Sequence, residues 1–137
     1  MYMIILFDWS GTISNLKKKD LLEGKKVINE KLIPFIQCNR IGIVSNTSKN
    51  PQQLTKAVKK EFKRLKMNVE VQIYNTMFPN GDMFRKPSPW MIWYALHKMG
   101  IGDYKEVMYV GDKESDKKAA IEAGVGFIYI NKLLKLI

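Results

Sequence analysis

Two aspartates, each placed just after an apolar run, are the side chains of this sequence best suited to chemistry. Asp8 follows the apolar residues 2–7, and Asp112 follows residues 107–110 with Gly111 between them. Two carboxylates that meet in a cleft repel each other unless a cation joins them. Hard oxygen ligands with an unfilled shell suit Mg²⁺, which also accepts a phosphate oxygen as a ligand. The pair therefore predicts a magnesium site at which Asp8 attacks phosphorus and forms an aspartyl-phosphate.

Further polar positions suit the binding of a phosphoryl group. Lys86 offers a positive charge that would keep Asp8 ionised and neutralise the transferred group. Ser45 offers a hydroxyl for a phosphate oxygen, and Asn46 follows it in the same polar cluster. Gly11 allows the backbone to approach a phosphate closely, and N–H groups in its loop can bind one. Ser45 could also be a plain turn residue, and Lys86 a solvated surface lysine.

The sequence leaves open the roles of a third aspartate and of two tryptophans. Asp116 stands four residues after Asp112 and could support the metal site. It could instead favour the start of a helix, where negative charge is stabilising, or do both. Trp9 and Trp90 could line a substrate cleft, and they could equally pack in the core.

The spacing of apolar residues predicts strands that alternate with helices about five times. A continuous apolar run such as residues 2–7 is typical of a strand buried on both faces. Asn50 and Pro51 together predict a helix start, with Asn50 as its cap. The expected strands are residues 2–7, 41–44, 69–74, 107–110 and 126–130. The expected helices are residues 20–37, 51–66, 89–99, 115–123 and 131–137, with a loop over residues 75–85.

Alternation of this kind predicts a parallel α/β sheet with helices on both faces. Neither repeats nor linkers interrupt the pattern, so we expect one domain over residues 1–137. The carboxyl ends of parallel strands meet at one edge of an open sheet, where ligands bind. Asp8 and Asp112 are therefore expected to lie close together despite their separation in sequence.

The polar clusters resemble the four ordered motifs of the haloacid dehalogenase (HAD) superfamily. Residues 8–12, Asp-Trp-Ser-Gly-Thr, are similar to its first motif, Asp-x-Asp-Gly-Thr. Ser45 after an apolar strand resembles the second, and Lys86 before a proline resembles the third. Gly111-Asp112 with Asp116 resembles the fourth. Each motif alone is a weak indication of the family. All four occur here in the family's order, and together they span essentially the whole chain.

The resemblance implies a three-layer, Rossmann-like fold with five parallel strands in the order 5-4-1-2-3. It also implies a magnesium-dependent phosphatase or phosphotransferase with Asp8 as nucleophile. Mg²⁺ would be bound by Asp8, the backbone carbonyl of Ser10 and Asp112, with Asp116 in support. Ser45 and Lys86 would bind the phosphoryl group.

Ser10 departs from the family pattern. Phosphatases of the family usually have a second aspartate at this position, which acts as general acid and then as general base. A hydroxyl titrates far from neutrality and is a poor acid–base catalyst, so turnover could be slow by roughly 10²–10⁴-fold. The alternative is a catalytically weak or inactive module that binds a phosphorylated or nucleic-acid partner.

The spacing of the motifs predicts that the chain lacks a cap domain. Only 36 residues separate Asp8 from Ser45, and 40 separate Ser45 from Lys86. The strands and helices of the sheet use up both intervals. The cap-less plan resembles the histidinol-phosphatase and polynucleotide 3′-phosphatase group. Such members act on macromolecules or use a neighbouring subunit as a lid, so an oligomer is one expectation.

The chain carries a formal charge of +10, contributed by 20 lysines and 3 arginines against 13 acidic residues. This charge indicates either an acidic partner such as nucleic acid or the lysine bias of an AT-rich genome. Apolar runs are too short for a membrane span or a signal peptide. A single cysteine excludes an internal disulfide. We therefore expect a cytoplasmic protein that does not bind membranes.

Overall fold

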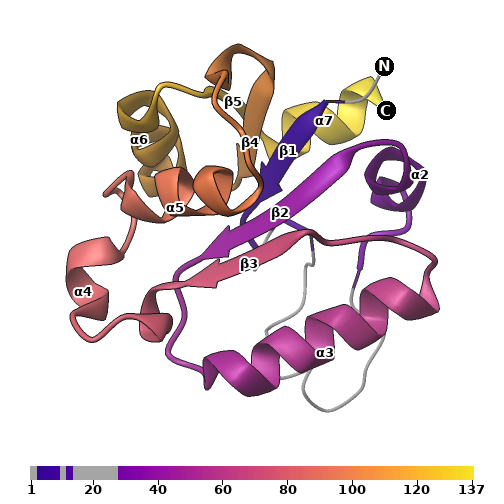
Figure 1. Ribbon diagram of the computed structural model, residues 1–137. Coiled ribbons are helices and arrows are strands. Elements are labelled where there is room, and N and C mark those ends of the chain that lie inside the picture. Colours follow the sequence, from indigo (N-terminus) through magenta and orange to yellow (C-terminus); the bar gives the residue numbers. More distant parts are fainter. Residues whose placement is uncertain (1–2, 10–11, 14–27) are drawn as a thin grey trace.

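The computed structural model describes residues 3–9, 12–13 and 28–137, and these residues contain one five-stranded parallel sheet (Figure 1). Its strands lie in the order β3-β2-β1-β4-β5, which is the expected order read from the opposite edge. The strands are β1 (Ile4–Phe7), β2 (Arg40–Ser45), β3 (Val71–Tyr74), β4 (Val107–Gly111) and β5 (Gly126–Tyr129). Each differs from its predicted range by no more than two residues at either end.

Helices cover both faces of the sheet and complete three layers (Figure 1). One face carries α2 (Leu32–Gln37), α3 (Pro51–Arg64) and α7 (Ile130–Leu136). The other carries α5 (Trp90–Lys98) and α6 (Glu114–Ala123). The short α4 (Gly81–Phe84) and two 3₁₀ turns, η1 (Asn75–Met77) and η2 (Tyr104–Glu106), complete the described helices. The described residues contain no cap domain, and no helix among them is long and apolar enough to cross a bilayer.

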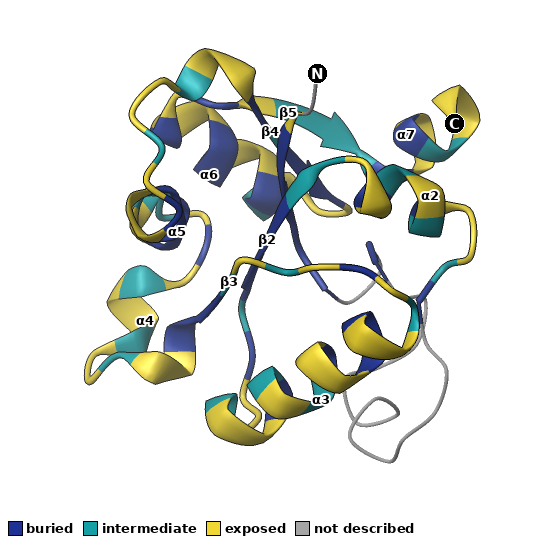
Figure 2. Ribbon diagram, turned by 45° about the vertical axis from the view of Figure 1, so that its right-hand side comes forward, coloured by how far each residue is buried: buried dark blue, intermediate teal, exposed yellow. Residues whose placement is uncertain are grey.

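The central strand β1 shows why its sequence is apolar without interruption. Ile5 and Phe7 belong to the core beneath α2 and α3, whereas Ile4 and Leu6 belong to the core beneath α5 and α6. Successive side chains of a strand point to opposite faces, so a sheet covered on both sides buries every position. Figure 2 shows the buried central strands and the exposed outer faces of the helices.

Helix α3 begins as the sequence predicts. The Asn50 side chain accepts a hydrogen bond from the Gln53 backbone N–H at 3.0 Å, and Pro51 is the first helical residue. This cap satisfies one of the N–H groups that a helix start leaves without a partner. The helix ends at Arg64, two residues before the expected end.

Two predicted segments differ from the structure. The prediction of a helix over residues 20–37 is wrong for residues 28–31. The Asn29 N–H donates to the Ile13 carbonyl instead of forming a helical hydrogen bond. Residues 20–27 lie outside the described part. The loop expected over residues 75–85 contains η1 and α4. These turns pack tightly, since a Cβ on Gly81 would lie 2.6 Å from the Asn75 carbonyl oxygen.

The buried face of α3 provides a test of the core. Phe62 is 1% exposed, so Phe62→Ala should lower the free energy of unfolding by about 3–5 kcal/mol, through lost burial and a residual cavity. Lys60→Ala on the exposed face should change it by less than about 0.5 kcal/mol. Urea unfolding of both variants measures the difference. Equal effects would contradict the described packing of α3.

Candidate active site

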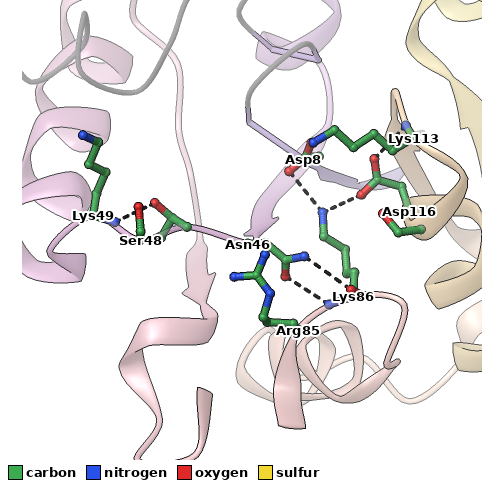
Figure 3. Close-up of a pocket in the computed structure, with 10 residues that line it drawn as sticks. Asp8, Asn46, Ser48, Lys49, Arg85, Lys86, Lys113 and Asp116 are labelled. Atoms are coloured by element: carbon green, nitrogen blue, oxygen red, sulfur yellow. Dashed lines mark hydrogen bonds and ion pairs between the residues drawn. The ribbon is translucent and has the colours of Figure 1, made fainter. Parts of the chain in front are cut away.

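The predicted functional residues gather at the carboxyl edge of the sheet. Asp8 follows β1, Ser45 ends β2, and Asp112 follows β4. Since β1 pairs with β2 on one side and with β4 on the other, the parallel register brings these three positions together. Figure 3 shows the pocket at this edge, with Asp8, Lys86 and Asp116 around one point.

Lys86 is buried at the base of the pocket, with a side chain only 3% exposed. Its Nζ lies 3.1 Å from Asp8 Oδ1 and 2.5 Å from Asp116 Oδ1. It also donates to the Tyr109 hydroxyl at 2.7 Å and lies 3.4 Å from the Val44 carbonyl oxygen. A buried ammonium is costly without such partners, and here two carboxylates balance it. The surface-lysine alternative for Lys86 is therefore wrong.

Asp8 Oδ1 accepts a second hydrogen bond, from the Ser45 hydroxyl at 2.9 Å. Both side chains are buried, at 7% and 0% exposure. Hydrogen bonds to the charged form of a carboxylate stabilise it, and so does the adjacent ammonium of Lys86. These two contacts therefore hold the Asp8 carboxylate in one orientation at the end of β1.

Tyr109 is a member of this cluster that the sequence analysis missed. Its hydroxyl donates to the Val44 carbonyl at 2.7 Å while it accepts from Lys86. Burial raises the pKa of Tyr109 well above its usual value, and the nearby Asp8 carboxylate raises it further. The phenol thus stays neutral and acts as a fixed dipole beside Lys86. The sequence contained a signal for this role, since Tyr109 lies inside an apolar strand and a buried hydroxyl requires a hydrogen-bond partner.

Asp116 has the helix-start role that the sequence left open, and its support of a metal stays a prediction. Its Oδ1 pairs with Lys86, while its Oδ2 accepts from the backbone N–H groups of Asp112 and Lys113, both at 3.1 Å. The second set of bonds lies at the start of α6, where a negative charge is favourable. Asp116 therefore links α6, the loop after β4 and the buried lysine through its hydrogen bonds.

Asp8, Asp112 and Asp116 form a candidate cation site. They can each offer a carboxylate oxygen, and these oxygens lie within 4.8 Å of one another. Desolvation raises the pKa of Asp112, and repulsion from the Asp8 and Asp116 carboxylates raises it further. A cation at this point would relieve that repulsion. The hard oxygen donors fit Mg²⁺.

Asn46 contacts the backbone of Lys86 at both ends of its amide. Its Oδ1 accepts from the Lys86 N–H at 3.0 Å, and its Nδ2 donates to the Lys86 carbonyl at 3.4 Å (Figure 3). The geometry thus gives Asn46 a positioning function that the sequence did not reveal. Its phosphate contact stays a prediction.

Two predicted residues, Ser10 and Gly11, lie outside the described part of the chain, so their roles also stay predictions. The adjacent Trp9 is fully buried in the core under α2 and α3. Trp9 is therefore a core residue, whereas Trp90 is 55% exposed.

The site opens into a pocket of about 540 Å³. Its walls carry Asn46, Thr47, Ser48, Lys49, Arg85, Lys86, Lys113 and Ser115, together with Asp8 and Asp116. Within the described chain, the side chains of Lys49, Arg85 and Lys113 form no ion pair. Three cations from three separate segments therefore line the pocket (Figure 3). Such a surface attracts an anion.

The chain belongs to the haloacid dehalogenase-like hydrolase family, whose model matches residues 36–130. This match confirms the family that the four motifs indicated. A comparison with curated protein sequences finds no match.

Solved structures share the fold. D,D-heptose 1.7-bisphosphate phosphatase from B. bronchiseptica, complexed with magnesium and phosphate, is 19% identical with a TM-score of 0.74. That alignment covers 91% of this chain and 78% of the other. A HAD-superfamily hydrolase from Geobacter sulfurreducens PCA is 15% identical over 100% of both chains, with a TM-score of 0.67. At these identities the likeness concerns the fold alone.

Gly111 provides a test of how the site is held. A Cβ at this position would lie 2.5 Å from both Cβ and Oδ2 of Asp116, so Gly111→Ala must displace that side chain. We expect a loss of about 1–3 kcal/mol in unfolding free energy, the usual cost of overpacking. Gly102→Ala is the matched control, because no atom lies within 4 Å of its added Cβ. Equal stability of the two variants in urea would contradict this close approach.

Proposed function

We propose that this protein is a magnesium-dependent phosphohydrolase that works through an aspartyl-phosphate on Asp8. The observation that carries the proposal is the environment of Asp8 Oδ1. It accepts from both Ser45 and Lys86 at the base of a pocket lined by cations. A carboxylate oriented in this way suits attack on phosphorus, and the cations suit a substrate with a phosphate group.

In the first step, the Asp8 carboxylate forms a bond to phosphorus while the bond between phosphorus and the leaving oxygen breaks. The Lys86 ammonium and the Ser45 hydroxyl stabilise charge on the phosphoryl oxygens. In the second step, water attacks phosphorus, the acyl-phosphate bond breaks, and inorganic phosphate leaves with Asp8 regenerated. Each step exchanges one bond to phosphorus for another. The leaving oxygen takes a proton from water in the first step and the attacking water gives up a proton to solvent in the second, so the protons balance over the cycle.

The metal would be bound by Asp8, Asp112 and the backbone carbonyl of Ser10. When bound, Mg²⁺ neutralises negative charge and orients a phosphate oxygen. Asp116 has a supporting role in this proposal, because both of its oxygens already accept hydrogen bonds. It holds the Asp112 backbone and the Lys86 ammonium in place.

Ser10 sets the expected limit on turnover. Without a carboxylic acid at this position, the leaving oxygen must take its proton from water. Substrates whose leaving group is stable as an anion, such as aryl phosphates, should therefore react faster than alkyl phosphates.

The open pocket bears on the class of substrate. No cap closes over it among the described residues, so the walls leave room for a group attached to a large molecule. This supports a phosphorylated macromolecule as substrate, as in the cap-less group that the motifs resemble. A neighbouring subunit acting as lid is the other arrangement consistent with an open site.

Hydrolysis of p-nitrophenyl phosphate with Mg²⁺ tests the mechanism. Asp8→Asn should abolish hydrolysis because it removes the nucleophile, and Ser10→Asp should raise kcat by roughly 10²-fold because it restores a general acid. Lys105→Gln, an exposed change at the amino end of β4, should leave kcat unchanged.

Hydrolysis that survives Asp8→Asn would contradict the phosphoenzyme. The absence of turnover and of Mg²⁺-dependent beryllofluoride binding, in wild type and in Ser10→Asp, would instead favour the non-catalytic binding module.

Metal addition provides an independent test. A ligand that binds only the folded state raises its stability with concentration, so millimolar MgCl₂ should raise the melting temperature of the wild type. Asp112→Asn should remove that rise because it deletes a ligand and its charge. Asp82→Asn, at an exposed aspartate of α4, should retain it. Equal rises in all three proteins would contradict the site at Asp112.

A further inference from the structure

Five aromatic side chains line a second pocket, of about 240 Å³, outside the candidate active site. They come from the segment around α4 and from α5, and they are Phe78, Phe84, Trp90, Trp93 and Tyr94. Trp90 and Tyr94 are 55% and 38% exposed. Solvent-exposed aromatic rings gathered in one place are typical of a binding surface.

Ring–ring packing holds this aromatic pocket in shape. Phe78 and Phe84 are stacked with centroids 4.5 Å apart. Trp90 meets Phe84 edge to face at 6.4 Å and meets Trp93 in the same way at 5.4 Å. The Trp93 indole N–H donates to the Ala123 carbonyl at 3.0 Å, which anchors this ring to α6. A ligand ring would therefore enter a pre-formed site with little loss of side-chain entropy.

The aromatic pocket and the cationic pocket are lined by neighbouring residues of the chain. Phe84 lines the first and its chain neighbour Arg85 lines the second. The chain then passes through Lys86 and returns to the aromatic pocket at Trp90. In Figure 1, α4 lies beyond the arrowheads of β2 and β3, at the carboxyl edge of the sheet where Asp8 and Asp112 also lie.

The charge around the aromatic pocket is mainly positive. Residues 78–98 contain one acidic side chain, Asp82, against the exposed Arg85 and Lys98. Lys86 is buried and paired with Asp8 and Asp116. Lys98 Nζ lies 5.4 Å from the centroid of the Tyr94 ring. With +10 on the whole chain, a second copy would bring like charge to this surface. An occupant with flat rings and negative charges is complementary to it.

We propose that this surface binds single-stranded nucleic acid, with a base stacked in the aromatic pocket and backbone phosphates near Arg85. Stacking on aromatic rings combined with a cationic groove is the usual way in which proteins bind single strands. A duplex would fit poorly, because its base faces are already stacked on one another. The surface lies outside the phosphoryl-transfer residues, so this binding does not depend on hydrolysis at Asp8.

Fluorescence anisotropy with a labelled thymidine strand of about 12 nucleotides tests the proposal at low salt. A duplex and an abasic strand of equal length serve as comparison ligands, since the abasic strand has the phosphates without the bases. We expect the thymidine strand to bind more tightly than both, with an affinity that falls as salt increases.

The variants Trp90→Leu and Tyr94→Leu should each weaken binding of the thymidine strand on the order of tenfold, since each removes a stacking surface. Trp90→Phe, which keeps a ring, should retain most of the affinity. Arg85→Gln should reduce the salt dependence, whereas Lys105→Gln should have little effect. Hydrolysis of p-nitrophenyl phosphate should be unchanged by Trp90→Leu.

Equal binding of the thymidine and abasic strands, or no effect of Trp90→Leu, would overturn the proposal in favour of charge alone. Sedimentation that shows a dimer dissociated by Trp90→Leu, without strand binding, would assign the surface to self-association. Ring-dependent strand binding by a protein without Asp8-dependent hydrolysis would support this proposal and contradict only the proposed catalytic function.

Discussion

The buried ammonium of Lys86 between Asp8 and Asp116 is the interaction on which the rest of the site depends. Removing one partner from a buried ion pair typically costs about 3–5 kcal/mol, because a charge is left without compensation. The described structure surrounds this cluster with neutral contacts that fix it. Tyr109 stays a neutral phenol beside the lysine, and Asn46 holds the lysine backbone from the end of β2. Three strand ends and the start of α6 are thereby joined through one side chain.

The negative charges of this cluster outnumber its positive charge. The three carboxylates lie within reach of one cation, while Lys86 interacts directly with only Asp8 and Asp116. Desolvation raises the pKa of Asp112, and the remaining repulsion from Asp8 and Asp116 raises it further. Along the pocket walls, in contrast, positive charge predominates. The proposed phosphoryl transfer follows from this separation, with negative charge at the base for a metal and positive charge on the walls for a phosphate.

The aromatic pocket differs from the active site in the physical basis of its recognition. Its walls are rings held by ring packing and by one indole hydrogen bond to the main chain. The active site selects charge, whereas the aromatic pocket selects flat apolar groups. Their adjacency through the chain around Arg85 allows one extended ligand to use both kinds of recognition.

The sequence by itself determined the layered fold and the meeting of Asp8 with Lys86 and Asp112, and the resemblance of its motifs to a known family implied the strand order. These follow from apolar runs, parallel topology and ordered motifs, which are local or rule-governed properties. Only the tertiary structure decided that Tyr109 and Asn46 belong to the lysine cluster. It also decided that residues 28–31, within the helix expected over residues 20–37, are not helical. Such outcomes depend on contacts between distant segments, where long-range hydrogen bonds compete with local preference.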